Sequence, residues 1–558
     1  MLDSAGSVCY HYYQECDSPK ESNPMRRPIA LLLTLFLVGV TLLGCGGGTT
    51  PTPVSAQTLR IIAGSENKTL EPLLMEYASK AHLNLEITYK GSVDIMLELE
   101  RGAAIPYDAI WPANSLWIAL GDKAGIVKTQ ESIWRSPVVF GVKKSVAERL
   151  GWVGRDVTVG DILAASEAGK LRFMMSSATQ SNSGASAYMG FLYAFAGQPE
   201  VLTSGALQDP AVRDKVKRIL GSVNRTAGSS GWLKDLFLDQ YVGYDAMVNY
   251  EALIIETNQE LLKTGREPLY AVYPVDGLAL ADSPLGYVNK GDAKKEEAFR
   301  ALQAFLLTPE TQNRILALGR RVGPLGLNSA TADRSVFRPE WGIDVARVIT
   351  PIKFPPAPVM REALTLYQTA FRKPSLTIFC LDFSGSMAGQ REQDLKTAMR
   401  LLLDQQQAAT YLLQASPDDI TVVIPFDNRL RAEWSVTGND QQALYDLTAK
   451  IVQTEASGGT DIYSPSIRAL EIIKSKNYEN YASAVILMTD GESNTGKKLG
   501  DLQGRYRELG FSNLPVYSIL FGEASPKQLQ EIATLTSGRI FDGKTNLIDA
   551  FREAKGYN

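Results

Sequence analysis

The chain has 558 residues, a length that allows two or three domains. Its 57 basic and 61 acidic residues leave a formal net charge of −4, which argues against a nucleic-acid-binding surface. Hydrophobic residues make up 45% of the chain, an ordinary share for a globular protein.

The N-terminal part of the sequence predicts export. Met25–Arg27 is a short basic region, and Pro28–Leu43 is an almost unbroken apolar run. The run is too short for a comfortable membrane span and has the shape of a signal peptide. We expect translation to begin at Met25, so that residues 1–24 are a misassigned extension.

The apolar run ends in Leu42-Leu43-Gly44-Cys45, which resembles the bacterial lipobox. That resemblance implies a lipoprotein signal peptide over 25–44, cleavage before Cys45 and attachment of a lipid such as palmitate to Cys45. The sequence GGGTTPTPVSAQ, which follows Cys45, then predicts a flexible tether, with bounds 45–56. The mature protein would be anchored to the cell membrane and face the periplasm or the exterior. The alternative is a transmembrane anchor with a chance cysteine.

Cysteine and histidine are too few for several kinds of site. Once residues 1–44 are removed, only Cys45 and Cys380 remain, so neither a disulfide framework nor a thiolate zinc site can form. Cys380 lies in an apolar run and is expected to be buried. Ser-His-Asp and Cys-His catalysis would both depend on His82, which lies in a polar stretch with no nucleophile nearby.

Residues 57 to about 344 alternate between expected strands and helices, which indicates a parallel or mixed α/β fold. The expected strands lie in TLRIIAG, LNLEITYK, YDAIW, VVFGVKK, LRFMMSS and AVYPVDG. The order of elements resembles a two-lobed periplasmic solute-binding protein of the molybdate-like branch. The segments that carry this resemblance are ITYKGSVDIMLELERG, YDAIWPAN, SSATQSNSGASAYMGF, GYDAMVNYEALI and YPVDGLALADSPLGYV. It implies a solute-binding-protein-like region over 57–349.

The resemblance directs several helix starts into one cleft between the lobes. Helix N-termini favour anions because their N–H groups are unpaired. Ser65, Ser92 and Ser183 stand near expected helix starts, where each could donate to a ligand or cap its helix.

Further wall candidates of the cleft are Asn114, Tyr244 and Glu251. Glu66, next to Ser65, departs from a plain oxyanion pattern and puts a bare molybdate-like ligand in doubt. A solute with a cationic group, or a site adapted to something else, therefore remains open.

Residues 350–374 connect the two regions, with a proline-rich PIKFPPAPVM followed by the helical REALTLYQTAFRKP. The C-terminal region, 375–558, then has doubly wound α/β order. Its expected elements are a strand (Leu376–Leu381), a long helix (Arg391–Leu413), a strand (Ile420–Phe426), a helix, a strand (Ala484–Thr489), a strand (Pro515–Phe521) and two closing helices.

Five oxygen-bearing residues stand where these strands meet loops. They occur in FCLDFSGSMAG, ASGGTDIY and AVILMTDGES, and are Asp382, Ser384, Ser386, Thr460 and Asp490. Loops at the carboxyl ends of parallel strands gather at one edge of a sheet. Two carboxylates and three hydroxyls suit a hard divalent cation and leave it incompletely neutralised, with an open position for a partner's carboxylate or water.

This pattern resembles the von Willebrand factor A domain and its metal-ion-dependent adhesion site. The resemblance implies direct coordination by Ser384 and Ser386, and by Thr460 in some states, with Asp382 and Asp490 acting through water. The implied cofactor is Mg²⁺, or Mn²⁺ or Ca²⁺, and the implied partner is a protein that supplies an Asp or Glu.

Two similar motifs do not fit. A haloacid-dehalogenase-type phosphatase needs a second Asp where Ser384 stands. The stretch GESNTGKK nearly spells a P-loop, but Lys498 replaces the hydroxyl that would bind Mg²⁺.

The sequence therefore favours a non-enzymatic, membrane-tethered binding protein. In this hypothesis the first region binds or senses a small solute and the second docks a protein partner. One alternative is the solute receptor of an ABC importer with an accessory A-type domain. Another is a hydrolase that uses the metal to activate water, with Glu492 as the nearest spare carboxylate.

Overall fold

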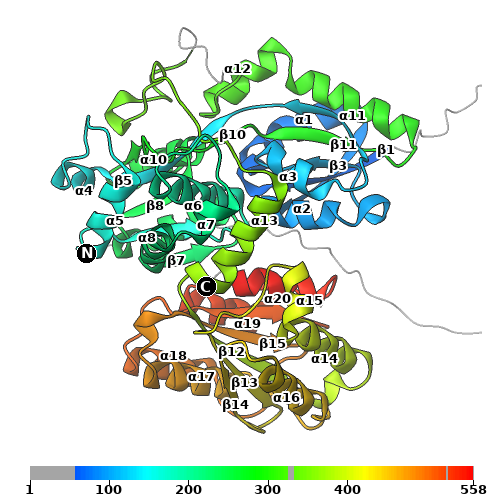
Figure 1. Ribbon diagram of the computed structural model, residues 1–558. Helices are drawn as coiled ribbons and strands as arrows, with labels where there is room; N and C mark the ends of the chain where they lie inside the picture. The colour runs from blue at the N-terminus through cyan, green and yellow to red at the C-terminus, as the bar shows by residue number, and fades with distance from the viewer. Residues whose placement is uncertain (1–56, 324–331, 523–525, 557–558) are drawn as a thin grey trace, which may run out of the picture. The chain divides into compact units, whose positions relative to one another are not determined.

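The computed structural model describes residues 57–323, 332–522 and 526–556 (Figure 1). The expected signal peptide, the tether and Cys45 lie outside these residues. Three β-sheets form within the described residues, each flanked by helices. The α/β class expected from the sequence is confirmed.

The first sheet forms the core of lobe 1, with the strand order β2-β1-β3-β11-β4. β1 pairs in parallel with β2 and β3, whereas β11 runs antiparallel to β3 and β4. The strands are β1 (Gln57–Gly64), β2 (Leu83–Lys90), β3 (Ala109–Trp111), β4 (Val127–Ser132) and β11 (Pro284–Val288). The helices are η1 (Ser65–Leu70), α1 (Glu71–Lys80), α2 (Ser92–Leu99), η2 (Gly102–Ala104), α3 (Ser115–Gly121), α11 (Ala293–Leu306) and α12 (Pro309–Ala317).

The second sheet forms the core of lobe 2, with the order β10-β5-β8-β6-β7 and β9 paired to β5. β5 and β6 are buried along their whole lengths because helices cover both faces. The strands are β5 (Ser136–Lys143), β6 (Phe173–Ser176), β7 (Val223–Ala227), β8 (Ala246–Tyr250), β9 (Leu269–Val272) and β10 (Leu280–Ala281). The helices are α4 (Lys144–Arg149), α5 (Val159–Glu167), α6 (Asn182–Phe195), α7 (Ser204–Gln208), α8 (Pro210–Gly221), α9 (Ser230–Asp239), η3 (Tyr241–Gly243) and α10 (Glu251–Lys263).

The chain passes between the lobes from β4 to β5, from β10 to β11, and again after α12 on its way to α13. The first two crossings run side by side, because Ile133 N donates to Ser283 O at 3.1 Å and the Ser132 hydroxyl donates to Asp282 O. Of the predicted cleft residues, Ser65, Ser92 and Asn114 follow β1, β2 and β3 in lobe 1, and Ser183 and Glu251 follow β6 and β8 in lobe 2. Tyr244 instead precedes β8 and lies at the opposite end of that strand.

The connector is a packed element of lobe 2. After η4 (Pro339–Trp341), helix α13 (Ala357–Leu366) continues into a π-helical turn, η5 (Tyr367–Phe371). Tyr188 of α6 donates its hydroxyl to Ala363 O at 2.8 Å, and its ring lies 5.3 Å from that of Tyr367. Removing α13 would therefore expose part of the lobe 2 core.

The third sheet has the order β14-β13-β12-β15-β16-β17, with only β14 antiparallel. Its strands are β12 (Ser375–Asp382), β13 (Ile420–Phe426), β14 (Trp434–Thr437), β15 (Ala482–Thr489), β16 (Val516–Leu520) and β17 (Ile540–Asp542). Its helices are η6 (Gly385–Met387), α14 (Gln390–Leu403), α15 (Gln405–Thr410), α16 (Gln441–Val452), α17 (Tyr463–Ser475), η7 (Tyr478–Asn480), α18 (Leu499–Glu508), α19 (Pro526–Thr536) and α20 (Leu547–Gly556).

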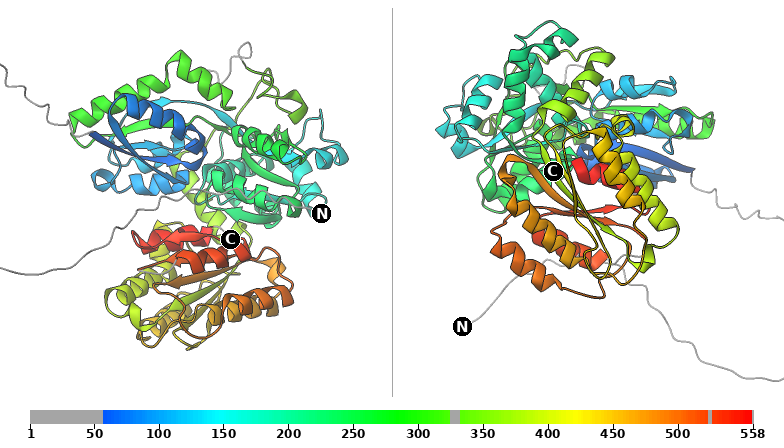
Figure 2. Two further views of the ribbon diagram at one scale, coloured as in Figure 1. Left: turned by 180° about the vertical axis from the view of Figure 1, so that it is seen from behind. Right: turned by 60° about the horizontal axis from the view of Figure 1, so that its bottom comes forward.

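Helices cover both faces of this third sheet. Phe379 and Leu381 of β12 pack in one core with residues of α14, α16 and α20. Ile378 and Cys380 face the other way, into a core with α17, α18 and α19. In the right view of Figure 2 the yellow-green and orange helices stand on opposite sides of the strands. This alternation explains why β12 is buried on both faces and reads as a continuous apolar run.

The prediction of one long helix over Arg391–Leu413 is wrong, because this segment forms two helices, α14 and α15. Asp404 has extended backbone angles and ends α14, and its carboxylate accepts hydrogen bonds from the backbone N–H groups of Gln406 and Gln407. An Asp that caps a new helix start competes with continuing the old one. The strands β14 and β17 were not expected.

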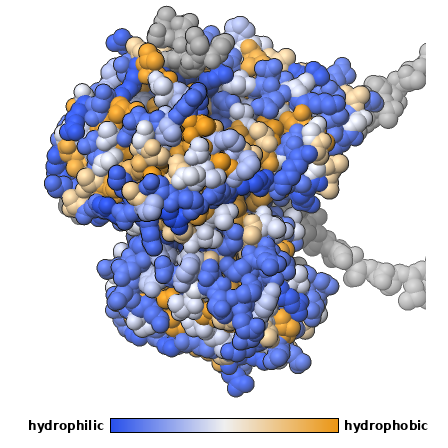
Figure 3. Space-filling model, in the orientation of Figure 1, coloured by the Kyte–Doolittle hydropathy of each residue, from blue (hydrophilic) through white to orange (hydrophobic). Residues whose placement is uncertain are grey.

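Among the described residues, no helix is both long and apolar enough to cross a bilayer. On the face shown in Figure 3, hydrophilic residues predominate and hydrophobic ones are scattered in small groups.

Candidate metal site and solute cleft

The five oxygen-bearing residues of the C-terminal domain gather at one edge of the third sheet. Asp382 is the last residue of β12, and Asp490 directly follows the neighbouring parallel strand β15. The strand order reverses between these two strands, since β13 lies on the other side of β12. Ligand sites in such sheets form where the order reverses, outside the carboxyl ends of the strands.

Hydrogen bonds tie the first three residues to Asp490. Asp382 Oδ1 accepts from Ser384 N at 2.7 Å, and Oδ2 accepts from Thr489 Oγ1 at 2.5 Å. The hydroxyl oxygens of Ser384 and Ser386 lie 3.1 Å apart. Ser386 then donates to Asp490 Oδ1 at 2.7 Å. The structure therefore brings these four residues into one connected cluster.

Thr460 does not stand where a strand meets a loop, as expected, but between helices α16 and α17, and it joins the same cluster through its loop. Gly385 N donates to Gly458 O at 2.9 Å, which fastens the loop after β12 to the loop before α17. Asn494 N donates to Thr460 O at 3.0 Å, and Asn494 Oδ1 accepts from Thr460 N at 3.1 Å. A Cβ placed on Gly491 would lie 3.4 Å from Ser386 Oγ and 3.5 Å from Thr460 Oγ1, so both hydroxyls converge on one point.

The donor set fits a hard divalent cation. All five side chains offer oxygen, and Asp382, Ser384, Thr460 and Asp490 are buried. Burial raises the pKa of Asp382 to about 6, against the hydrogen bonds from Thr489 and Ser384, which lower it. Buried carboxylates are stabilised by a nearby positive charge. No cluster of three or more His, Cys, Asp or Glu side chains in the described part of the chain could hold a metal, so hydroxyls would have to contribute.

Sequence reasoning missed Arg391 as a member of this cluster. Its Nη1 donates to Asp490 Oδ2 at 2.7 Å. The signal available in the sequence was a basic residue at the expected start of a helix, where basic residues are unfavourable.

In the solute-binding-like region, the predicted serines lie at the facing loops of the two lobes. Ser65 opens η1 in lobe 1, and its Oγ accepts a hydrogen bond from Gly231 N of lobe 2 at 2.9 Å. Gly91 lies so close to lobe 2 that a Cβ there would be 2.1 Å from Gln180 O. The lobes therefore touch directly at these two loops.

The other two serines already have partners within the protein. Ser92 Oγ accepts from Ala113 N at 2.9 Å. Ser183 Oγ lies 2.7 Å from Ser176 Oγ and 2.8 Å from Ser230 Oγ, so three buried hydroxyls share one network. Neither serine is simply the cap of its own helix.

The three remaining candidates are held by different contacts. Asn114 caps α3 by accepting from Leu116 N at 2.9 Å. The Tyr244 hydroxyl accepts from Asn513 Nδ2 at 3.1 Å. Both carboxylate oxygens of the fully buried Glu251 accept from Arg321 at 2.7 Å, and the Tyr273 hydroxyl also donates to it. Glu251 therefore forms a buried ion pair.

A pocket of about 460 Å³ lies beside these loops, and among the six predicted cleft residues Ser65 is the one that lines it. Its other lining residues include charged side chains of both signs, namely Lys68, Lys90, Asp94, Lys234, Asp235 and Glu256 and, from the C-terminal domain, Arg539 and Glu553. Mixed charge does not favour a bare oxyanion. A polar solute carrying both kinds of group would match these walls better.

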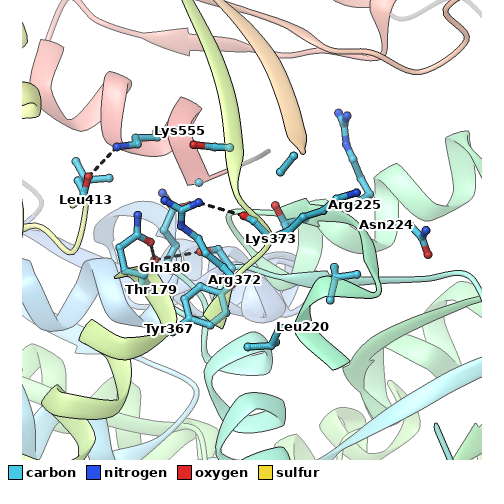
Figure 4. A pocket seen from close by; sticks show the side chains of 17 residues that line it. Thr179, Gln180, Leu220, Asn224, Arg225, Tyr367, Arg372, Lys373, Leu413 and Lys555 are labelled. Atoms are coloured by element: carbon cyan, nitrogen blue, oxygen red, sulfur yellow. Dashed lines mark hydrogen bonds between the residues drawn. The ribbon is translucent and has the colours of Figure 1, made fainter. Parts of the chain in front are cut away.

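A smaller pocket, of about 60 Å³, borders the connector (Figure 4). Its cations have protein partners: Lys555 donates to Leu413 O at 2.7 Å and Arg372 to Lys373 O at 3.1 Å. Burial lowers the pKa of Lys555 to about 8. These contacts mark a structural junction, and we assign no ligand to it.

Comparison with known proteins agrees with this division of the chain. Residues 59–321 match the family model described as bacterial extracellular solute-binding protein. Residues 377–492 match the model of the von Willebrand factor type A domain. The chain joins a solute-binding-protein-like domain to a von Willebrand factor type A domain. The first match agrees with export of the protein.

The curated relatives share only part of their length with this chain. Calcium-activated chloride channel regulator 1 of Sus scrofa is 30% identical over 186 residues, which are 33% of this chain and 18% of the relative. Inter-alpha-trypsin inhibitor heavy chain H2 of Homo sapiens is 28% identical over 157 residues, or 27% of this chain and 16% of the relative.

Solved structures resemble each domain separately. The sulfate-binding protein SubI from Mycobacterium tuberculosis H37Rv has 18% identity and a TM-score of 0.38, covering 54% of this chain and 94% of its own. The periplasmic molybdate-binding protein of Azotobacter vinelandii has 15% identity and a TM-score of 0.33, covering 48% and 99%. A von Willebrand factor type A protein from Catenulispora acidiphila has 20% identity and a TM-score of 0.28, covering 34% and 43%. At these scores we draw nothing on function from them.

Proposed function

We propose that this protein is an exported, lipid-anchored binding protein whose von Willebrand factor A domain docks a protein partner through a divalent cation. The observation that carries the proposal is the convergence of Asp382, Ser384, Ser386, Thr460 and Asp490 where the strand order reverses. Ser384, Ser386 and Thr460 would hold Mg²⁺ directly, and the two carboxylates through water. When bound, the cation supplies a positive coordination position for an Asp or Glu of the partner.

The residues of the chain prepare this position. Asp382 is fixed by Ser384 N and Thr489 Oγ1, so its carboxylate cannot rotate away from the loop. Ser386 is fixed against Asp490. These bonds hold the donors in place before a cation arrives, which reduces the entropy lost on binding.

We propose that the protein is not an enzyme. His82, the only histidine in the described residues, is exposed in the turn between α1 and β2 and has no role in the cluster. Glu492 is the nearest additional carboxylate in sequence, and it is exposed. A hydrolase would predict metal-dependent phosphatase or protease activity, which assays of the purified protein with Mg²⁺ or Mn²⁺ would detect.

The test of the proposal is capture of a partner from a solubilised cell envelope. The wild type should retain one or more envelope proteins in Mg²⁺ and release them in chelator, whereas Asp382→Ala should retain none. Solute-induced thermal shifts of Asp382→Ala should match those of the wild type. Equal capture with Mg²⁺ and with chelator would contradict the proposal.

For the first domain we propose binding or sensing of a small polar solute. The mixed charges around the 460 Å³ pocket support this solute class. A thermal-shift panel of oxyanions, amino acids and sugars tests it. The full protein should be used, because α13 completes the core of lobe 2. No shift across a broad panel would contradict it.

The second candidate function is the solute receptor of an ABC importer, favoured by the two lobes and the paired crossings between them. It predicts lobe closure on solute binding and impaired uptake of that solute when the gene is deleted. The lipid anchor at Cys45 belongs to both proposals, and Cys45→Ala should move the protein from the membrane fraction to the soluble one.

A further inference from the structure

Arg391 contacts the carboxylate that completes the candidate metal site. Its Nη1 donates to Asp490 Oδ2 at 2.7 Å, while Asp490 Oδ1 accepts from Ser386 Oγ at 2.7 Å. The same nitrogen lies 3.4 Å from Ser386 O. The Asp490 side chain is fully buried, whereas that of Arg391 keeps 36% of its exposure. Asp490 is therefore both a predicted ligand of the cation and the partner of a permanent positive charge, Arg391.

The helix by itself does not favour Arg391 at this position. Arg391 is the second residue of α14, and the N-terminus of a helix carries partial positive charge. The N-cap residue is Gly389, which offers no side-chain hydrogen bond. A basic residue in this first turn is unfavourable unless an anion offsets it, and Asp490 is the anion that does so.

A second loop is shaped around the same ion pair. Gly522 follows β16 with a φ of +55°, and a Cβ at this residue would lie 2.9 Å from Cζ and Nε of Arg391. The same Cβ would be 3.0 Å from the Cβ of Asp490. A larger residue with this backbone conformation would be strained and would displace the guanidinium, so the segments of Arg391, Asp490 and Gly522 meet at the ion pair.

Arg391 changes the net charge of the candidate metal site. Asp382 and Asp490 together carry −2 when ionised, and Arg391 reduces this to −1. A divalent cation would bring the cluster to +1, whereas the same cluster without Arg391 would become neutral. Because charges this close interact strongly away from bulk water, Arg391 opposes the cation and favours an incoming carboxylate.

We propose that Arg391 is a built-in counter-cation that weakens divalent-cation binding and keeps the loaded site positive, so that it selects an acidic partner. The inference rests on the proposed metal-dependent docking function. Arg391 is in this sense a specificity-determining residue that acts through charge.

The first part of the proposal, that Arg391 weakens cation binding, is tested by titration calorimetry of the full protein with Mg²⁺ or Mn²⁺ and no other ligand. Arg391→Gln should bind each cation about tenfold more tightly than the wild type, the size expected from removing one neighbouring charge near the surface. Arg391→Lys should resemble the wild type. Arg400→Gln, an exposed arginine of the same helix, is the matched control and should leave both affinities unchanged.

The sign of the change separates two roles. If Arg391 only positions Asp490 for the metal, Arg391→Gln will bind Mg²⁺ more weakly, and that result overturns the inference while leaving the proposed function intact. Unchanged affinity also overturns it. Binding by Arg391→Gln without measurable binding by the wild type supports the inference and contradicts the proposed function. Folded proteins that bind neither cation, wild type and variant alike, overturn both.

Melting temperatures and a carboxylate probe provide two further readouts. Without metal, Arg391→Gln should have a lower melting temperature than the wild type, because the buried Asp490 loses its counter-charge. Addition of Mg²⁺ should then raise the melting temperature of the variant more than that of the wild type. Glutarate, used as a carboxylate probe, should show several-fold weaker Mn²⁺-induced NMR line broadening with Arg391→Gln than with the wild type, both saturated with Mn²⁺. Equal broadening would overturn the second part of the proposal, that Arg391 helps the loaded site to select an acidic partner.

Discussion

Glu66 provides the sharpest test of the electrostatics in the solute-binding-like domain. It lies in η1, only 3% of it is exposed, and no hydrogen-bond partner reaches its Oε1 within the described part of the chain. Arg320 is nearby, but its Nη2 donates to the backbone oxygen of Glu66 at 2.6 Å and to Glu256 Oε1 at 2.8 Å. The Glu66 carboxyl is therefore buried without full compensation, and burial raises its pKa from 4.5 to about 7.

The raised pKa makes the stability of this domain fall as the pH rises. Below pH 4.5 the carboxyl is protonated in both the folded and the unfolded chain, so burial has no ionic cost. Between pH 4.5 and 7 the unfolded chain releases the proton and the folded chain retains it. A shift of about 2.5 units at about 1.4 kcal/mol per unit gives a penalty of roughly 3 kcal/mol above pH 7.

Substitution Glu66→Gln removes the titration and leaves a side chain of similar size. The stability of the variant relative to the wild type should increase by roughly 2–3 kcal/mol between pH 5 and pH 8. Urea unfolding followed by tryptophan fluorescence measures this difference, and any constant effect of the buried amide cancels between the two pH values. Glu148→Gln, at an exposed glutamate of α4, is the control. A Glu66→Gln difference that is the same at pH 5 and pH 8 would refute the reasoning.

Three other outcomes follow from the packing. Gly91→Ala should destabilise the fold by about 1–3 kcal/mol in urea unfolding, since its methyl group would meet Gln180 O; Gly504→Ala, with open space around it, should not, and equal effects would contradict the close approach. Glu251→Gln should cost about 3–5 kcal/mol in the same assay by leaving Arg321 buried and unpaired, and a cost below about 1 kcal/mol would contradict the ion pair. Burial raises the pKa of the Cys380 thiol well above its usual range, so in a variant lacking the other cysteines iodoacetamide should label it only after unfolding; rapid labelling of the native protein would show that β12 opens.

Much of the architecture could be predicted because fully buried strands have a strong local signature. β13 spans the expected Ile420–Phe426, and β12 and β15 each extend the expected strand by one or two residues. Buried parallel strands read as continuous apolar runs, which end where the chain meets solvent. The edge strand β14 was missed because only alternate residues are partly buried.

The placement of the cleft residues could not be predicted, because each depends on a partner far away in sequence. Ser65 meets Gly231 across the lobes. Ser183 shares its hydroxyl with Ser176, which is local, and with Ser230, which is not. A serine at a helix start has the same local sequence pattern whether it caps the helix, joins the two lobes or binds a ligand. Only the fold distinguishes these outcomes.

The sequence by itself determined that Asp382, Ser384, Ser386 and Asp490 stand at or just after the ends of buried strands, because apolar runs mark the strands and polar residues mark where they stop. Thr460 lies instead in the loop between α16 and α17. The sequence also determined the α/β order and the division of the chain into two kinds of domain. Tertiary structure alone decided that Asp490 meets Arg391 across 99 residues, that Gly522 makes room for the guanidinium, and that Glu251 is paired with Arg321. These pairings arise from strand order and loop packing, which bring together groups whose local sequences carry no information about each other.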